Sequence, residues 1–106
     1  MIAWNEIEEV GRDVGHAANA ERVIVFGSHA RGCATDDSDL DLLVVAESGL
    51  PRHKRSREIY RLVRPHHLAL DILVYTPAEI DRAMRTDVSF ISQAMHEGKT
   101  LYVRGN

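Results

Sequence analysis

The chain has 106 residues, 44% of them hydrophobic and 27% charged, which is the composition of one small globular domain spanning residues 1–106. Thirteen Lys and Arg against sixteen Asp and Glu give a net charge of −3, so direct nucleic-acid binding is not expected and any phosphate site must be local. The single cysteine, Cys33, excludes an internal disulfide and a cysteine-cluster zinc site. With no apolar leader and no membrane-length apolar run, the sequence predicts a cytoplasmic protein.

The first half of the chain predicts two helices and two strands. Apolar residues at spacings of three and four follow Trp4 and predict a helix that ends near Asn19, with Trp4 in the core. Residues 22–26 are a β-branched run typical of a buried strand. Residues 28–38 are small and polar and predict a short helix and a loop. Residues 40–45 predict a second strand that begins inside a group of carboxylates.

Six of the thirteen basic residues lie between Arg52 and Arg64. This segment predicts a basic amphipathic helix that ends before Pro65. A run of this kind is usually a solvated helix face, and the alternative is a docking strip for an acidic protein or an RNA-bearing partner. The sequence does not decide between these roles.

The remaining residues predict a third strand, two helices and an edge strand. Residues 67–75 form the strand, and Thr76 and Pro77 are suited to be the cap and first residue of a helix that runs through Met84. A short helix follows at about 88–97. The last edge strand is expected at residues 99–103.

Three aspartates are the candidate metal ligands. Asp39 and Asp41 lie two residues apart on a predicted strand, and the period of two places both carboxylates on one face. Asp71 lies inside the third strand. An acidic residue inside an apolar strand is costly unless it is paired or bound to metal, so the combination argues against three unrelated surface carboxylates. Hard oxygen ligands suit magnesium, and two such ions about 4 Å apart can stabilise both oxygens of an in-line phosphoryl displacement.

The turn after the first strand is the candidate phosphate site. Gly27 allows close approach of a phosphate to the backbone, and Ser28 adds a hydroxyl and begins a short helix with free N–H groups. Arg31 is placed to neutralise phosphate oxygens with its planar guanidinium. The adjacent His66 and His67 could be a metal pair, but neighbouring strand residues face opposite ways, which favours a surface loop.

The segment Gly27-Ser28-His29-Ala30-Arg31-Gly32, five further residues and then Ser38-Asp39-Leu40-Asp41-Leu42 resembles the signature of the DNA polymerase β-like nucleotidyltransferase superfamily. It is most similar to the minimal nucleotidyltransferases, short proteins often paired with HEPN-domain toxins, whose third carboxylate lies in a setting like Leu70-Asp71-Ile72. His29 and Cys33 occupy variable positions and are not expected to be catalytic. The resemblance implies an α/β (α+β) fold, a small mixed sheet with helices packed on one side.

The resemblance also implies an activity. The resemblance implies an antitoxin that uses ATP and magnesium to adenylylate a tyrosine of a HEPN ribonuclease toxin. In this reaction Asp71 would help to deprotonate the attacking tyrosine hydroxyl. A chain this short has little room for an acceptor domain and a thin stability margin, which favours an acceptor and partner on a separate protein and a hetero-oligomer. The alternatives are a binding module that masks its partner without catalysis, and transfer to a small molecule or an RNA end. The donor base, the acceptor, the oligomeric state and activity without a partner are not determined by the sequence.

Overall fold

Four strands form one mixed sheet in the order β3-β2-β1-β4 in the computed structural model, which describes residues 2–63, 68–86 and 89–105. β1 (Arg22–Phe26) pairs antiparallel with both β2 (Leu40–Val45) and β4 (Lys99–Val103). β3 (Leu70–Tyr75) pairs parallel with β2 at the opposite edge. The predicted mixed sheet and its edge strand are confirmed, whereas Pro65 and the pair His66 and His67 lie outside the described residues.

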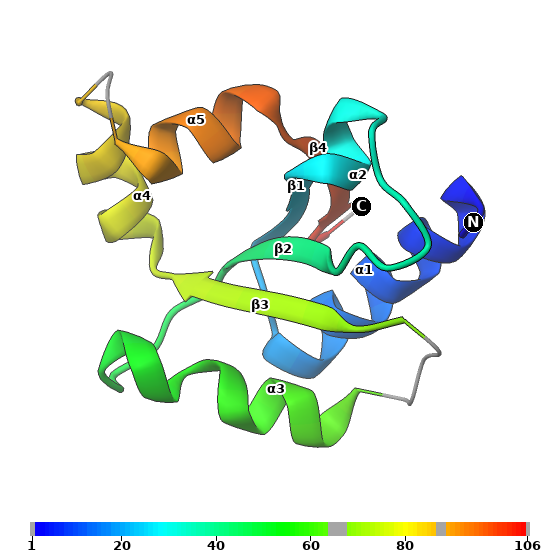
Figure 1. The fold of residues 1–106 in the computed structure, drawn as a ribbon. Helices are drawn as coiled ribbons and strands as arrows, with labels where there is room; N and C mark the ends of the chain where they lie inside the picture. Colours follow the sequence, from blue (N-terminus) through cyan, green and yellow to red (C-terminus); the bar gives the residue numbers. More distant parts are fainter. Residues whose placement is uncertain (1, 64–67, 87–88, 106) are drawn as a thin grey trace.

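Helices cover both faces of this sheet. α1 (Trp4–Ala18) and α3 (Ser56–Leu62) pack on one face, and α4 (Pro77–Met84) and α5 (Phe90–Glu97) pack on the other (Figure 1). The prediction of helices on one side is therefore wrong. The physical reason is that β1 and β2 carry consecutive apolar residues instead of an alternating pattern, so both of their faces have to be buried.

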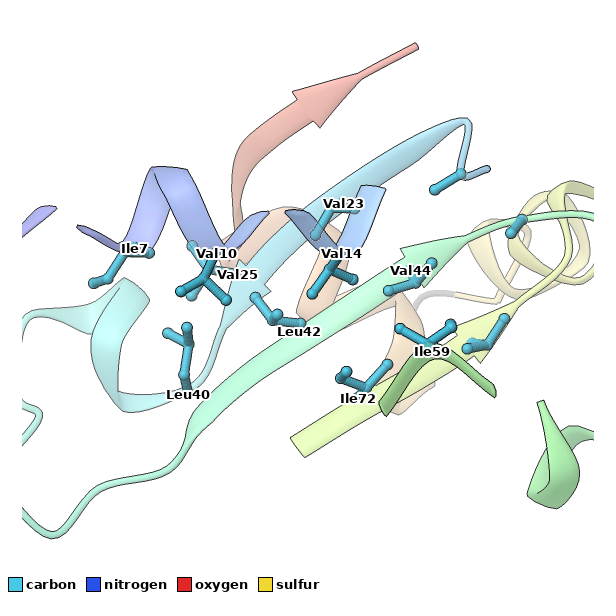
Figure 2. Close-up of a cluster of buried hydrophobic side chains, with 13 residues drawn as sticks. Ile7, Val10, Val14, Val23, Val25, Leu40, Leu42, Val44, Ile59 and Ile72 are labelled. Atoms are coloured by element: carbon cyan, nitrogen blue, oxygen red, sulfur yellow. The ribbon is translucent and has the colours of Figure 1, made fainter. Parts of the chain in front are cut away.

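The larger buried cluster fills the space between α1, α3 and the sheet. Figure 2 shows its side chains reaching toward one another from these two helices and from β1, β2 and β3. The cluster includes Ile7, Val10, Val14, Val23, Val25, Leu40, Leu42, Val44, Ile59 and Ile72. A second cluster under α4 and α5 contains Ile24, Phe26, Leu43, Val45, Ile80, Ile91 and Ala94. Strand residues therefore alternate between the two cores, which sets the face on which each polar strand residue lies.

The first helix lies very close to the last strand. A Cβ atom added at Gly11 would overlap the Leu101 side chain, and one at Gly15 would overlap the Tyr102 ring. α1 ends at Ala18, as predicted for an end near Asn19, and Asn19 adopts the left-handed conformation typical of a helix C-cap. Trp4 was expected in the core, but it is 40% exposed and its ring carries Lys99 Nζ 5.2 Å from the centroid. It lies in the first turn of α1, where its ring contacts the edge strand β4 instead of the buried cluster.

The basic segment is not one continuous helix. A 3₁₀ helix, η1 (Arg52–Lys54), precedes α3, and Arg55 between them has a side chain only 9% exposed. Arg55 Nη1 donates to Glu79 Oε1 at 2.6 Å and to the Val74 carbonyl at 3.2 Å, and its Nε donates to the Leu50 carbonyl at 2.9 Å. Arg55 therefore ties together three segments of the chain instead of forming part of a solvated face.

Glu79 is the acidic centre of the same network. It forms a capping box with Thr76, in which Thr76 Oγ1 accepts from the Glu79 N–H and Glu79 Oε1 accepts from the Thr76 N–H. The predicted Thr76 cap and the Pro77–Met84 helix are thereby confirmed. The hydrogen bond from Arg55, followed by that from the Thr76 backbone, lowers the pKa of Glu79 to about 2.

The outer edge of β3 is partly closed by side chains. Tyr60 Oη accepts from the Ile72 N–H at 2.8 Å and donates to the Leu70 carbonyl at 3.2 Å. Arg55 donates to the Val74 carbonyl on the same strand. Such contacts reduce the number of free backbone groups that another strand could use. None of the helices within the described ranges has the length and apolar character needed to cross a bilayer.

Candidate active site

Asp41 and Asp71 lie side by side on the adjacent strands β2 and β3. They are register partners in the parallel pair of β2 and β3, and Phe26 at the end of β1 is the antiparallel partner of Asp41. Side chains two residues apart on a strand share a face, so Asp41 lies on the face of Leu43 and Asp71 on that of Leu73. This is the face covered by α4 and α5. Asp39 is exposed two residues before Asp41. The fold therefore brings the predicted acidic residues of two strands to one place.

The carboxylates repel one another. Burial raises the pKa of Asp41, and the charges of Asp71 and then Asp39 raise it further. His29 and Arg31 act in the opposite direction and lower it. A concentration of negative charge with nearby cations is the setting in which a divalent cation and a polyphosphate can bind together.

Gly27 is required where β1 turns into the next element. Its φ of 74° and ψ of −150° belong to a region that essentially only glycine adopts, and a Cβ there would overlap Asp41 Oδ2. The missing side chain thus allows the turn to lie directly against the Asp41 carboxylate. Gly27 links the candidate phosphate turn physically to the candidate metal ligand.

We expect Gly27→Ala to reduce the free energy of unfolding by about 3 kcal/mol, combining backbone strain with the overlap at Asp41. Gly32→Ala is the matched control, because Gly32 also has a positive φ of 76° but has open space around its Cα. It should cost only about 1 kcal/mol. Urea denaturation of both variants tests this, and equal losses would show that the overlap with Asp41 has no energetic effect.

α2 (Ser28–Arg31) is the short helix predicted after this turn, and it consists of one turn. Ser28 is its half-buried first residue, and the Arg31 N–H donates to the Gly27 carbonyl at 3.0 Å. The Arg31 guanidinium forms an exposed ion pair with Glu97 of α5, with Nη1 3.6 Å from Oε2. An exposed pair of this kind is worth at most about 1 kcal/mol, so a phosphate can compete for Arg31.

A cavity of about 260 Å³ lies between α2, α5 and the end of β1. Gly27, Arg31 and Asp41 line it, and its other lining residues are Phe26, Phe90, Gln93, Ala94 and Glu97. Ser28, Asp39 and Asp71 are not among its lining residues. The sequence did not indicate the α5 residues, because nothing in a short amphipathic helix shows which residues at its polar margin face a site.

Oxygen donors are present for a magnesium ion. Within residues 2–63, 68–86 and 89–105, however, no three His, Cys, Asp or Glu side chains already form a group that could hold a metal ion. Magnesium in nucleotide sites is commonly held by one or two carboxylates together with substrate phosphates, so the in-register pair Asp41 and Asp71 fits such an ion. The mutual repulsion at Asp41 is what a cation would relieve.

Residues 7–102 match the nucleotidyltransferase domain family. The chain belongs to this family. The nucleotidyltransferase is 33% identical over 78 residues to a Methanocaldococcus jannaschii protein named "putative protein adenylyltransferase", with 74% of this chain and 75% of that protein covered. The expected enzyme class is thus confirmed by the family match.

Two solved structures share the fold of this nucleotidyltransferase. One is the crystal structure of a "putative nucleotidyltransferase" from Sulfolobus solfataricus, with 25% identity, a TM-score of 0.62, and 94% of this chain and 79% of that chain covered. The other is described as a toxin-antitoxin with AMP-PNP, with 20% identity, a TM-score of 0.55, and coverages of 98% and 76%. The predicted superfamily and mixed α/β architecture are confirmed.

Proposed function

We propose that this nucleotidyltransferase is a magnesium-dependent protein adenylyltransferase that uses ATP to modify a tyrosine of a partner HEPN ribonuclease toxin, and so acts as its antitoxin. The observation that carries the proposal is the register of Asp41 with Asp71 beside Gly27 and Arg31. A binding module that only masked its partner would need none of these groups. The relative from Methanocaldococcus jannaschii carries a protein adenylyltransferase name, which supports the proposed activity. A fold neighbour is a toxin-antitoxin with AMP-PNP, which supports the proposed antitoxin role.

The reaction assigns a task to each group. The acceptor oxygen forms a bond to the α-phosphorus of ATP, the bond from that phosphorus to the bridging β-phosphate oxygen breaks, and pyrophosphate leaves with the electron pair. The tyrosine proton passes to the Asp71 carboxylate, which acts as general base. Asp39, Asp41 and Asp71 would hold magnesium, which supplies charge neutralisation of the triphosphate when bound. Gly27, Ser28 and Arg31 hold the phosphates that leave.

Covalent modification explains how a small protein could inactivate a ribonuclease. Adenylate attached to a tyrosine adds bulk and negative charge, and both oppose the entry of RNA when the tyrosine lies near the toxin active site. The cationic residues along η1 and α3, including Arg52, Lys54 and Arg57, offer a surface for an acidic region of such a partner.

We expect adenylate to appear on the partner protein when the chain is incubated with magnesium, ATP and the product of the adjacent gene. Intact-protein and peptide mass spectrometry would locate it on a tyrosine, and Asp39→Asn should remove it. Arg31→Ala should also weaken ATP binding by roughly tenfold, as expected for loss of one charge-assisted phosphate contact. An unmodified partner that is nevertheless inhibited in a tight complex would instead support the masking module.

A further inference from the structure

Phe90 is an exposed aromatic side chain beside the candidate active site. It is 57% exposed, more than any other large apolar side chain in the described residues. It is the first residue of α5, which Ser89 caps by accepting a hydrogen bond from the Ser92 N–H. Its ring meets Phe26 edge-on, with centroids 5.6 Å apart and planes at 82°. Phe90 is therefore held in place from one side while most of its surface stays open.

Phe90 lies between two cavities. It lines the cavity of about 260 Å³ that contains Gly27, Arg31 and Asp41. It also lines a second cavity of about 380 Å³, formed by α4, the start of α5, the end of β3 and Arg52. Small-molecule sites are usually clefts of roughly 300–1,000 Å³ with few polar groups, so the second cavity alone is large enough for a heterocyclic ring.

The second cavity offers flat and cationic surfaces. Tyr75 lines it, and the Arg52 guanidinium lies 4.3 Å from the centroid of the Tyr75 ring while Nη2 pairs with Glu79 at 3.3 Å. Arg82 also lines it and forms no ion pair with any described residue. Aromatic rings together with guanidinium groups are the surfaces on which nucleobases stack in proteins.

The distance from the candidate metal ligand Asp71 to the second cavity matches a nucleotide. Tyr75 lies four residues beyond Asp71 on the same strand and face, which is about 13 Å at the usual rise per residue. This is comparable with the length of a nucleoside monophosphate. Gly27 and Arg31, the candidate phosphate residues, lie on the other side of Phe90. The acceptor hydroxyl has to reach Asp71 itself, so its reacting group cannot occupy a cavity this far along the strand.

We propose that the cavity formed by Tyr75, Arg82 and Phe90 receives the nucleobase of the donor triphosphate, with the base stacked on the Phe90 ring. This inference rests on the proposed function. The stack is expected to favour purines, because their larger ring system covers more of an aromatic side chain. Phe90 thus acts in donor binding and selection, while the carboxylates and Arg31 act on the phosphates.

The test is Phe90→Ala, measured by titration calorimetry with magnesium and two probes. One probe is a nonhydrolysable ATP analogue, and the other is inorganic tripolyphosphate, which has no base. Loss of the stack should weaken binding of the ATP analogue by about tenfold and leave the affinity for tripolyphosphate unchanged. Phe90→Trp should retain or improve binding of the analogue. Leu50→Ala is the matched control, since Leu50 is similarly exposed but lines neither cavity.

The outcomes separate this inference from the function on which it rests. Unchanged affinity of Phe90→Ala for the ATP analogue would overturn the base site and leave the enzyme proposal intact. Equal weakening of both probes would also overturn it, because Phe90 would then act on the shape of the whole site. If the parent protein bound neither probe, the proposed function would be contradicted, and the base site that rests on it would be contradicted as well.

Discussion

Asp41→Asn should lower nucleotidyl transfer by roughly a thousandfold while leaving the protein at least as stable as the parent. A group that stabilises transition-state charge together with a metal is worth several kcal/mol, and each 1.36 kcal/mol is a factor of ten in rate. Asn has the shape of Asp but cannot supply the negative charge. Burial and the neighbouring Asp71 and Asp39 charges already disfavour ionised Asp41, as its raised pKa indicates. Removing that charge therefore relieves repulsion in the folded state.

The measurement pairs transfer of label from α-labelled ATP with thermal unfolding of the same preparations. Asp37→Asn is the matched control, because Asp37 is an exposed carboxylate in the loop that precedes β2. It should change neither quantity appreciably. Transfer at the parent rate by Asp41→Asn would remove Asp41 from the catalytic site, and a large loss of stability would mean that its role is structural.

Arg55→Ala should reduce the free energy of unfolding by about 3 kcal/mol, the largest stability effect that we expect from a single exchange of a charged residue here. The change leaves the half-buried Glu79 carboxylate without its principal donor and frees the carbonyls of Leu50 and Val74. For a domain of this size, the loss corresponds to a drop in melting temperature of more than about 10 °C. Arg85→Ala removes the exposed pair with Asp81 and should cost less than about 0.5 kcal/mol.

The same network makes stability depend on pH in a defined direction. Folding lowers the pKa of Glu79 from 4.5 to about 2, so its carboxylate binds protons more weakly in the folded protein than in the unfolded chain. Its contribution, about 3 kcal/mol for this difference in pKa, is fully present above pH 4.5 and is lost as the pH falls through about 2. Urea unfolding at pH 7, 4.5 and 3 should show the gap between parent and Arg55→Ala narrowing as the solution is acidified. A constant gap would mean that Arg55 acts through packing alone.

Local patterns were sufficient to predict most of the elements. The β-branched run at residues 22–26, the capping residues Thr76 and Pro77, and the run at residues 40–45 each produced the expected element. Tertiary contacts decided the rest. The sequence left the basic run open between a solvated face and a docking strip, and the buried role of Arg55 could not be predicted because its partner, Glu79, lies 24 residues further along the chain. Trp4 matched the apolar periodicity, but its ring lies partly exposed beside Lys99 of the edge strand β4.

The site was only partly predictable for the same reason. The spacing of Asp39 and Asp41 placed two carboxylates on one face without knowledge of the fold. Their partner Asp71 could be placed opposite Asp41 only by the family resemblance, since strand order is not encoded in a local pattern. Phe90 and Glu97 reach the site because α5 crosses the second face of the sheet, and that face was expected to be uncovered. Because helices were expected on only one face of the sheet, the residues that α5 contributes to the site could not be predicted.

The close contact of α1 with β4 also bears on how the chain folds. Gly11 and Leu101 are ninety positions apart, and β1 obtains its second neighbour only from residues 99–103. During synthesis at about 5–20 residues per second, β1 and β2 can pair early, whereas the glycine face of α1 stays without its partner until the last strand is released. The docking of β4 is then a long-range closure, and contacts of this kind slow folding more than they lower stability. Changes at Gly11 or Leu101 should therefore act mainly on the late docking of β4.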